Sequence, residues 1–139
     1  MGKKVTVIST SLRHGSNSAV LADAFAMGAS EAGNEVTLIS LTGKDIHFCT
    51  GCLACQKTGK CVIHDDMNDM QEIVRTSDVL VFATPIYYYE MSGQMKTFLD
   101  RLNPLYIADC QFKDVYLLAS AAEEDELSLI HISEPTRRS

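Results

Sequence analysis

The stretch that decides the fold is Lys4-Val-Thr-Val-Ile-Ser-Thr-Ser-Leu-Arg-His-Gly-Ser-Asn-Ser18. Residues 4–9 are a short apolar run, typical of a strand that is buried on both faces of a sheet. Residues 10–18 are small and polar, and apolar residues at helical spacing then predict a helix over residues 18–32. A strand, a polar loop and a helix in this order indicate the first unit of an α/β fold.

The same alternation of strands and helices continues along the chain. Further strands are expected at 35–41, 79–83 and 115–119, and further helices are expected to begin at Asp65 or Asp66 and at Ser92. Strands that alternate with helices imply right-handed crossovers, and therefore a doubly wound parallel sheet with helices on both faces. Such a sheet binds its ligands at the carboxyl ends of the strands.

The composition is that of one globular domain. The chain has 139 residues, of which 46% are hydrophobic and 22% are charged, and its formal net charge is −6. A negative charge argues against nucleic acids and anionic membranes as partners. No stretch approaches the ~20 apolar residues that a membrane span needs, and the N-terminus lacks the apolar region of a signal peptide. We therefore expect a cytoplasmic protein with no nucleic-acid or membrane partner.

The loop after the first strand offers groups that bind phosphate. Its hydroxyl, amide and guanidinium donors precede a helix and are Ser9, Ser11, Arg13, Ser16, Asn17 and Ser18. Backbone N–H groups at the helix N-terminus add further donors. Gly15 alone does not make a dinucleotide fingerprint, and no nucleoside-triphosphate loop motif is present. An ordinary helix-capping loop is the alternative, but the position ahead of a second distinctive loop favours phosphate binding.

That second loop is Thr84-Pro-Ile-Tyr-Tyr-Tyr-Glu-Met-Ser-Gly93. Three consecutive tyrosines cannot all enter the core, because neighbouring side chains diverge. At least one ring should therefore face outward, where a flat heterocycle could stack on it. The alternative is that each tyrosine covers a helix end. For the loop as a whole, the pattern favours a pocket for a flat ligand.

Four of the five cysteines form a compact motif, Cys49, Cys52, Cys55 and Cys61. Thiolates at this spacing can reach one metal ion or iron–sulfur cluster, and clustered cysteines in a reducing compartment favour such chemistry over disulfides. The tight first spacings fit a 4Fe–4S cluster better than zinc. Free thiols in a loop that packs over a ligand or a subunit interface are the alternative. Cys110 lies outside the motif and is expected to be structural.

These motifs resemble those of the NAD(P)H-dependent FMN reductases in the flavodoxin-like superfamily. Residues 10–18 are similar to the family's Gly-Ser-Pro-Arg…Asn-Thr phosphate loop, with Thr10 and Leu12 in place of its glycine and proline. Residues 84–101 are similar to its Ser-Pro-Xaa-Tyr loop and the Lys…Asp-Arg helix that follows. Residues 49–67 resemble the cysteine motif of the iron–sulfur flavoproteins within that family. The resemblance covers about residues 3–122.

The resemblance implies a flavodoxin-like fold, bound FMN and NAD(P)H as co-substrate. The FMN phosphate would be held by Ser11, Arg13, Ser16, Asn17 and Ser18. The isoalloxazine ring would be lined by Pro85, Ile86, Tyr87, Tyr88 and Tyr89, and flanked by Ser120, Ala121 and Ala122. Hydride would pass from NAD(P)H to the flavin N5 without a protein acid or base, and then to a small-molecule or protein electron acceptor such as a flavin or a quinone. The family also implies a homodimer or a higher homo-oligomer.

The end of the chain carries a different resemblance. Residues 127–137 are similar to the translated end of a transposon adapter used in sequencing libraries. We therefore expect residues 1–126 to be a flavodoxin-like FMN-binding domain without its last strand and helix, and residues 127–139 to be a non-native tail. A genuine short strand at Leu127–Ile132 is the alternative. Two other functions stay open: an electron carrier with FMN and a cluster, and a non-functional truncated fragment.

Overall fold

The computed structural model describes residues 2–121, in which strands and helices alternate as the sequence predicts. The elements are, in chain order, β1 (Lys4–Ser9), α1 (Asn17–Glu31), β2 (Glu35–Ser40), α2 (Cys55–Thr58), α3 (Met67–Thr76), β3 (Val79–Tyr87), β4 (Glu90–Met91), α4 (Gly93–Asp100), the 3-10 helix η1 (Asn103–Ile107) and β5 (Asp114–Ser120).

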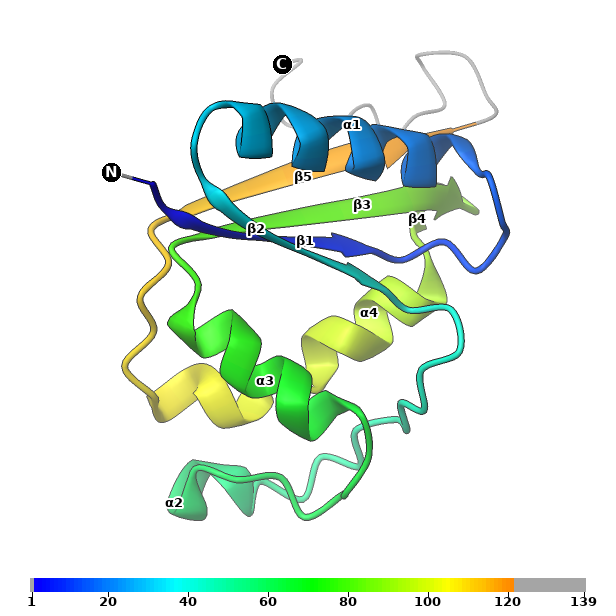
Figure 1. The fold of residues 1–139 in the computed structure, drawn as a ribbon. Coiled ribbons are helices and arrows are strands. Elements are labelled where there is room, and N and C mark those ends of the chain that lie inside the picture. Colours follow the sequence, from blue (N-terminus) through cyan, green and yellow to red (C-terminus); the bar gives the residue numbers. More distant parts are fainter. Residues whose placement is uncertain (1, 122–139) are drawn as a thin grey trace, which may run out of the picture.

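Four of the strands form a parallel sheet in the order β2-β1-β3-β5. The short β4 pairs antiparallel with the last residues of β3. Helix α1 covers one face of this sheet, and α3 and α4 cover the other (Figure 1). The doubly wound parallel sheet with helices on both faces is thus confirmed. Because the chain goes from β1 outward to β2 and then crosses to β3, the order of strands reverses between β1 and β3. A ligand crevice is expected outside the carboxyl ends of these two strands.

Two hydrophobic clusters lie on the two faces of the sheet. Successive residues of a strand point to opposite faces, so Val7 of β1 joins the cluster under α1, whereas the next residue, Ile8, joins the one under α3 and α4. Both side chains are fully buried. On the α1 side, Ala22 and Ala26 let the helix approach the sheet closely. These clusters fix the strand ends that carry the polar loops.

Strand β3 is longer than the sequence predicted. Residues 84–87 were expected to be loop, but they continue the strand, with Thr84 and Pro85 in register with β5 and Ile86 and Tyr87 in register with β4. That part of the loop prediction is wrong. The β-branched and aromatic residues here suit extended backbone, and this preference outweighs the proline.

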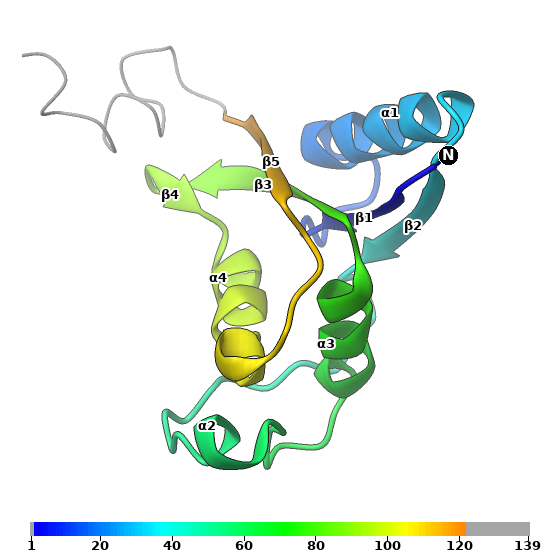
Figure 2. The ribbon, with the colours of Figure 1, turned by 90° about the vertical axis from the view of Figure 1, so that its left-hand side faces the viewer.

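The far side of α3 from the sheet holds the segment with the four cysteines. The short α2, which begins at Cys55, lies there, next to η1 (Figures 1 and 2). Strand β2 forms one edge of the parallel sheet and β5 forms the other. Within the described residues, β5 pairs with β3 alone. The expectations for Ala122, for the tail at 127–139 and for the missing last strand and helix lie outside the described residues. In residues 2–121, no helix combines the length and the apolar character of a membrane span.

Candidate functional site

The two polar loops at the ends of β1 and β3 are joined by a buried hydroxyl network. Thr10 donates to the Ala83 carbonyl twice, from its amide at 3.0 Å and from its hydroxyl at 2.8 Å. The Thr10 hydroxyl also lies 3.4 Å from that of Ser92, whose amide donates to Thr84 Oγ1 at 3.1 Å. These three hydroxyl side chains are completely buried. The loops therefore lie side by side at the edge of the sheet where a ligand is expected.

The loop after β1 presents a helix N-terminus with free amides. Ser16 caps α1: its hydroxyl accepts from the Ala19 amide at 3.2 Å, and its carbonyl accepts from the Val20 amide at 3.0 Å. The first amides of a helix have no partner within it. This cap leaves the amides of Asn17 and Ser18 without a bond from the helix. Such amides, at the positive end of a helix dipole, bind anions.

Most of the predicted hydroxyl donors in this loop hold the turn itself. The Ser11 hydroxyl accepts from the Arg13 amide at 3.2 Å, and the Ser16 and Ser18 hydroxyls lie 3.3 Å apart. These serines and Ser9 are buried, whereas Arg13 and Asn17 are exposed. All six predicted residues thus lie between the end of β1 and the first turn of α1. The side chains exposed to solvent are the guanidinium of Arg13 and the amide of Asn17.

The three tyrosines form a strained hairpin at the end of β3. Tyr87 pairs with Glu90, so Tyr88 and Tyr89 make a two-residue turn, and both have positive φ angles, 50° and 68°. Two-residue turns of this kind favour Asn-Gly, and a side chain in this region costs roughly 1–2 kcal/mol per residue. Strain of this kind often marks a ligand site. The prediction that at least one ring faces outward is confirmed, because Tyr88 is 93% exposed and the other two rings are also exposed.

The remaining predicted residues of this edge are placed beside the hairpin. Ser120, the last residue of β5, is in register with Pro85, and Ala121 follows it. The side chain of Ile86 is buried, and its place beside a flavin ring stays a prediction.

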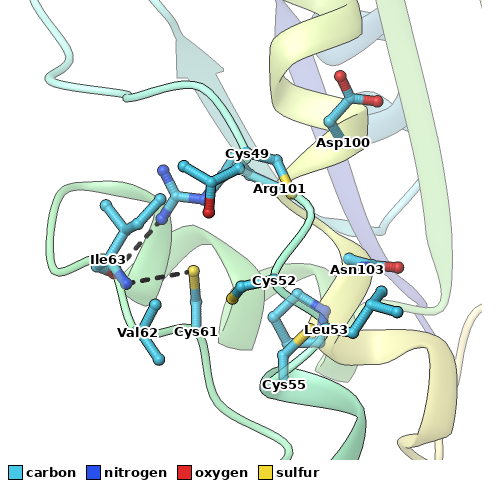
Figure 3. A pocket seen from close by; sticks show the side chains of 12 residues that line it. Cys49, Cys52, Leu53, Cys55, Cys61, Val62, Ile63, Asp100, Arg101 and Asn103 are labelled. Atoms are coloured by element: carbon cyan, nitrogen blue, oxygen red, sulfur yellow. Dashed lines mark hydrogen bonds between the residues drawn. The ribbon is translucent and has the colours of Figure 1, made fainter.

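All four cysteines of the compact motif line one pocket (Figure 3). Burial raises the pKa of the Cys55 thiol, and the charges of Cys61, Cys52 and Cys49 raise it further. Across residues 2–121, however, no three metal-binding side chains converge on the position of a single ion. Four cysteine thiols in the lining of one pocket are nevertheless the donor set that an iron–sulfur cluster uses.

Backbone amides reach two of these sulfurs. The Gly51 amide donates to Cys49 Sγ, and the Ile63 amide donates to Cys61 Sγ, both at 3.4 Å. Gly51 has a φ of 73°, which a glycine adopts without strain, and this turn points its amide back at the sulfur. Amide donors to sulfur are a means by which proteins tune iron–sulfur clusters.

A buried ion pair behind the pocket was missed by sequence reasoning. Arg101 donates to both carboxylate oxygens of Asp65, at 2.7 and 2.9 Å, and neither side chain is exposed. Burial alone would raise the pKa of Asp65, but hydrogen bonds from Arg101 and from the amides of His47 and Met67 lower it to about 2. The sequence signal was the Asp-Arg pair that ends the helix. Asp65 was predicted only as a helix cap, and its Oδ1 does accept from the Met67 amide at 3.0 Å.

The similarity to known proteins extends over most of the chain. The family model described as NADPH-dependent FMN reductase matches residues 3–129. An iron–sulfur flavoprotein of Archaeoglobus fulgidus is 37% identical over 102 residues, which are 73% of this chain and 46% of that protein. One of Methanocaldococcus jannaschii is 35% identical over 104 residues, 75% of this chain and 54% of that protein. The chain thus spans about half the length of the curated relatives it matches.

Solved structures share the fold. An NAD(P)H:quinone oxidoreductase from Methanothermobacter marburgensis superimposes with a TM-score of 0.76 at 18% identity, over 99% of this chain and 76% of that one. The protein RosB, with a bound formylriboflavin phosphate, gives a TM-score of 0.71 at 21% identity, over 99% of this chain and 60% of that one. At such identities these structures establish the flavodoxin-like fold alone. The match of the family model over residues 3–129 shows that this chain belongs to the NADPH-dependent FMN reductase family.

Proposed function

We propose that this protein is an FMN-dependent oxidoreductase that passes electrons from NAD(P)H to an acceptor. The observation that carries the proposal is the buried contact of Thr10 with Ala83 and Ser92. It keeps an anion-binding helix N-terminus and an exposed aromatic hairpin at one edge of the sheet. FMN is a ligand with a phosphate at one end and a flat ring system at the other, so its two ends match these two features.

The residues at this edge fit the cofactor. The free amides of Asn17 and Ser18, with the exposed guanidinium of Arg13, would hold the phosphate dianion. The exposed tyrosine hairpin on one side and Ser120 on the other would flank the ring. Bound FMN would supply the redox chemistry by accepting a hydride from the nicotinamide and giving up its electrons to an acceptor.

The chain's own residues would therefore bind and orient rather than react. No side chain in residues 2–121 has to act as an acid or a base in hydride transfer, and none is assigned that role. The backbone of residues 85–89 would meet the polar edge of the ring and set its reactivity through hydrogen bonds. The acceptor would be a free flavin, a quinone or a protein. A cytoplasmic location and a homodimer or higher homo-oligomer stay predictions.

A second candidate function is favoured by the pocket of four cysteines. With Cys49, Cys52, Cys55 and Cys61 as ligands, this pocket would hold a 4Fe–4S cluster, which exchanges single electrons. A protein with both centres would be suited to carry electrons between protein partners. The four sulfurs in one cavity and the amide donors to two of them support this assignment.

Two measurements on anaerobically purified protein test these functions. Titration with FMN, followed by quenching of flavin fluorescence, should saturate at one FMN per chain. Steady-state oxidation of NADH and NADPH, with and without a quinone or free FMN, then separates the two candidates. An oxidoreductase turns over nucleotide with these small acceptors, whereas an electron carrier reduced by a protein partner barely does. Protein that remains colourless after saturation with FMN and gel filtration would contradict both functions.

A further inference from the structure

Arg101 is a buried charge that the proposed flavin chemistry does not use. It follows the last residue of α4, lines the cysteine pocket and is 1% exposed. A guanidinium keeps its charge at all relevant pH values, and moving an ion out of water carries a penalty unless close partners compensate. Its place in the pocket wall therefore calls for a role in what the pocket holds.

The guanidinium joins both ends of the cysteine segment, residues 49–61, to the end of α4. Its Nη1 donates at 2.9 Å to the carbonyl of His47, two residues before the segment. Its Nη2 donates at 3.5 Å to the carbonyl of Ile63, two residues after it. The amide of Ile63 in turn donates to Cys61 Sγ (Figure 3). One side chain thus bonds to the backbone on both sides of the cysteine segment.

One N–H donor of the Arg101 guanidinium has no hydrogen-bond acceptor in the described part of the chain. The Nε of Arg101 is buried and has no hydrogen-bond partner within residues 2–121. A buried donor without an acceptor is unfavourable, and more so when it is charged. The Asp65 carboxylate raises the pKa of Arg101, and Cys61 acts in the same direction. Arg101 and Cys61 both line the pocket.

We propose that Arg101 is a positioning residue for an iron–sulfur cluster in the cysteine pocket. It fixes both ends of the cysteine segment and places positive charge beside the thiolates, while Asp65 holds the guanidinium in orientation. The inference rests on the proposed cluster. Partners just outside the ligands govern how firmly a metal centre is held, and hydrogen bonds and charge near the sulfurs set its reduction potential.

The test compares the full-length wild type with two variants. Arg101→Lys keeps a positive charge but lacks the planar fork that reaches His47, Ile63 and Asp65 together. The double variant Asp65→Asn with Arg101→Gln replaces the ion pair by two amides that can still bond to each other, so it guards against simple misfolding. Each protein is reconstituted anaerobically with ferrous iron and sulfide. Iron per chain, the rate of iron release to a chelator and the midpoint potential are then measured.

We expect both variants to release iron faster by about 10–100-fold, as is typical when a partner of a metal ligand is lost. The double variant loses the positive charge of Arg101, which lines the pocket, and the negative charge of Asp65, which does not, so it should also show a more negative midpoint potential. Arg75→Lys is the matched control, because Arg75 pairs with Glu72 on α3, outside the pocket, and it should behave as the wild type. FMN content and thermal unfolding are recorded for every protein, so that a local effect is separated from global loss of structure.

Two outcomes would overturn the inference, and they differ in what they mean. Wild-type release rates and potentials in both variants would show that Arg101 has no role in a cluster that exists. A wild type that binds FMN but takes up no iron would remove the cluster itself, and the oxidoreductase function would stand without it.

Discussion

The hydroxyl of Thr10, at the end of β1, lies 3.4 Å from the hydroxyl of Ser92, which caps α4. Both groups are buried, and the Ser92 hydroxyl accepts from the Met95 amide at 3.3 Å as it begins the helix. A contact between residues 82 positions apart thus connects the proposed phosphate-binding loop to the helix that follows the tyrosine hairpin. The geometry of the proposed flavin site depends on this network.

Removal of the Thr10 hydroxyl should therefore weaken both the fold and the site. Thr10→Val removes the 2.8 Å hydroxyl bond to the Ala83 carbonyl, which keeps the Thr10 amide as a donor, so the loss is that of one hydrogen bond, ~0.5–1.5 kcal/mol. We expect the free energy of unfolding in urea to fall by that amount and the affinity for FMN to fall as well. Thr37→Val, at an exposed position of β2, is the control and should change neither quantity. Unchanged stability in Thr10→Val would contradict the network.

The tyrosine hairpin should be more stable with the residues that such turns prefer. Tyr88→Asn combined with Tyr89→Gly places Asn-Gly at the two positive φ positions, which should stabilise the flavin-free protein by about 1–2 kcal/mol. The same change removes two exposed rings, so we expect the dissociation constant for FMN to rise. Urea unfolding and flavin titration measure the two effects. Tyr106→Asn removes another exposed ring from η1 and serves as the control. FMN binding at full strength in the double variant would argue against a ring site at the hairpin.

The helix N-terminus should recognise the phosphate of FMN specifically. Arg13→Gln removes the exposed guanidinium of this turn, and hydrogen bonds to charged groups contribute ~1.5–3 kcal/mol. We expect the affinity for FMN to fall about tenfold or more, while that for riboflavin, which has no phosphate, stays the same. Isothermal titration with both flavins checks this. Arg75→Gln controls for the general loss of positive charge. An equal loss for both flavins would place Arg13 elsewhere than at the phosphate.

The ion pair of Asp65 and Arg101 should make stability fall in acid. The pKa of Asp65 is about 2 in the folded protein and ~3.9 in an unfolded chain. A carboxylate whose folded pKa is lowered stabilises the fold above its unfolded pKa, and this contribution is lost as the pH falls from about 4 through 2. Asp65→Asn should therefore be less stable at neutral pH, by roughly 3–5 kcal/mol, and should lose part of its pH dependence in this range.

Urea unfolding of this variant at several pH values is the measurement. Asp23→Asn, at an exposed position of α1, is the control and should keep the wild-type profile. If the profiles of wild type and Asp65→Asn stay parallel between pH 2 and 4, Asp65 is not the titrating group.

Iron binding should distinguish the cysteines of the pocket from the fifth one. Cys55→Ser removes a sulfur that is buried in the pocket, so we expect iron per chain to fall to a small fraction of the wild-type value. Cys110→Ser is the matched control, because Cys110 lies outside the pocket and donates weakly to the Leu105 carbonyl at 3.8 Å. FMN content should be the same in both. Equal iron in both variants would exclude Cys55 as a ligand.

The regular part of the fold was predictable because local patterns specify it. The apolar runs of β1 and β5 and the Ser92 cap of α4 each combine a periodicity with a stop or start signal, and the structure places them within a residue or two. The hairpin at Tyr88 and Tyr89 was missed because no local sequence pattern predicts it. Its two residues lack the Asn-Gly signal of a tight turn, so only the surrounding structure specifies the backbone there.

The candidate site was predictable as a set of loops but not as a set of contacts. The sequence indicates which residues gather at the carboxyl ends of β1 and β3, but it does not reveal that the hydroxyls of Ser11 and Ser16 also accept hydrogen bonds from amides of the same loop. Their role as phosphate ligands stays a prediction. The Asp65–Arg101 pair joins residues 36 positions apart, and no local periodicity reports such a distance.

Helix α4 has one end in each of the two proposed sites. It starts at Ser92, within the hydroxyl network, and ends at Arg101, in the wall of the cysteine pocket. Eight helical residues rise ~12 Å, so the helix is a rigid spacer of fixed length. If both prosthetic groups are present, the length of α4 sets the distance between them that an electron must cross within one subunit. Motion of the exposed loops would then leave the rate of that internal transfer unchanged.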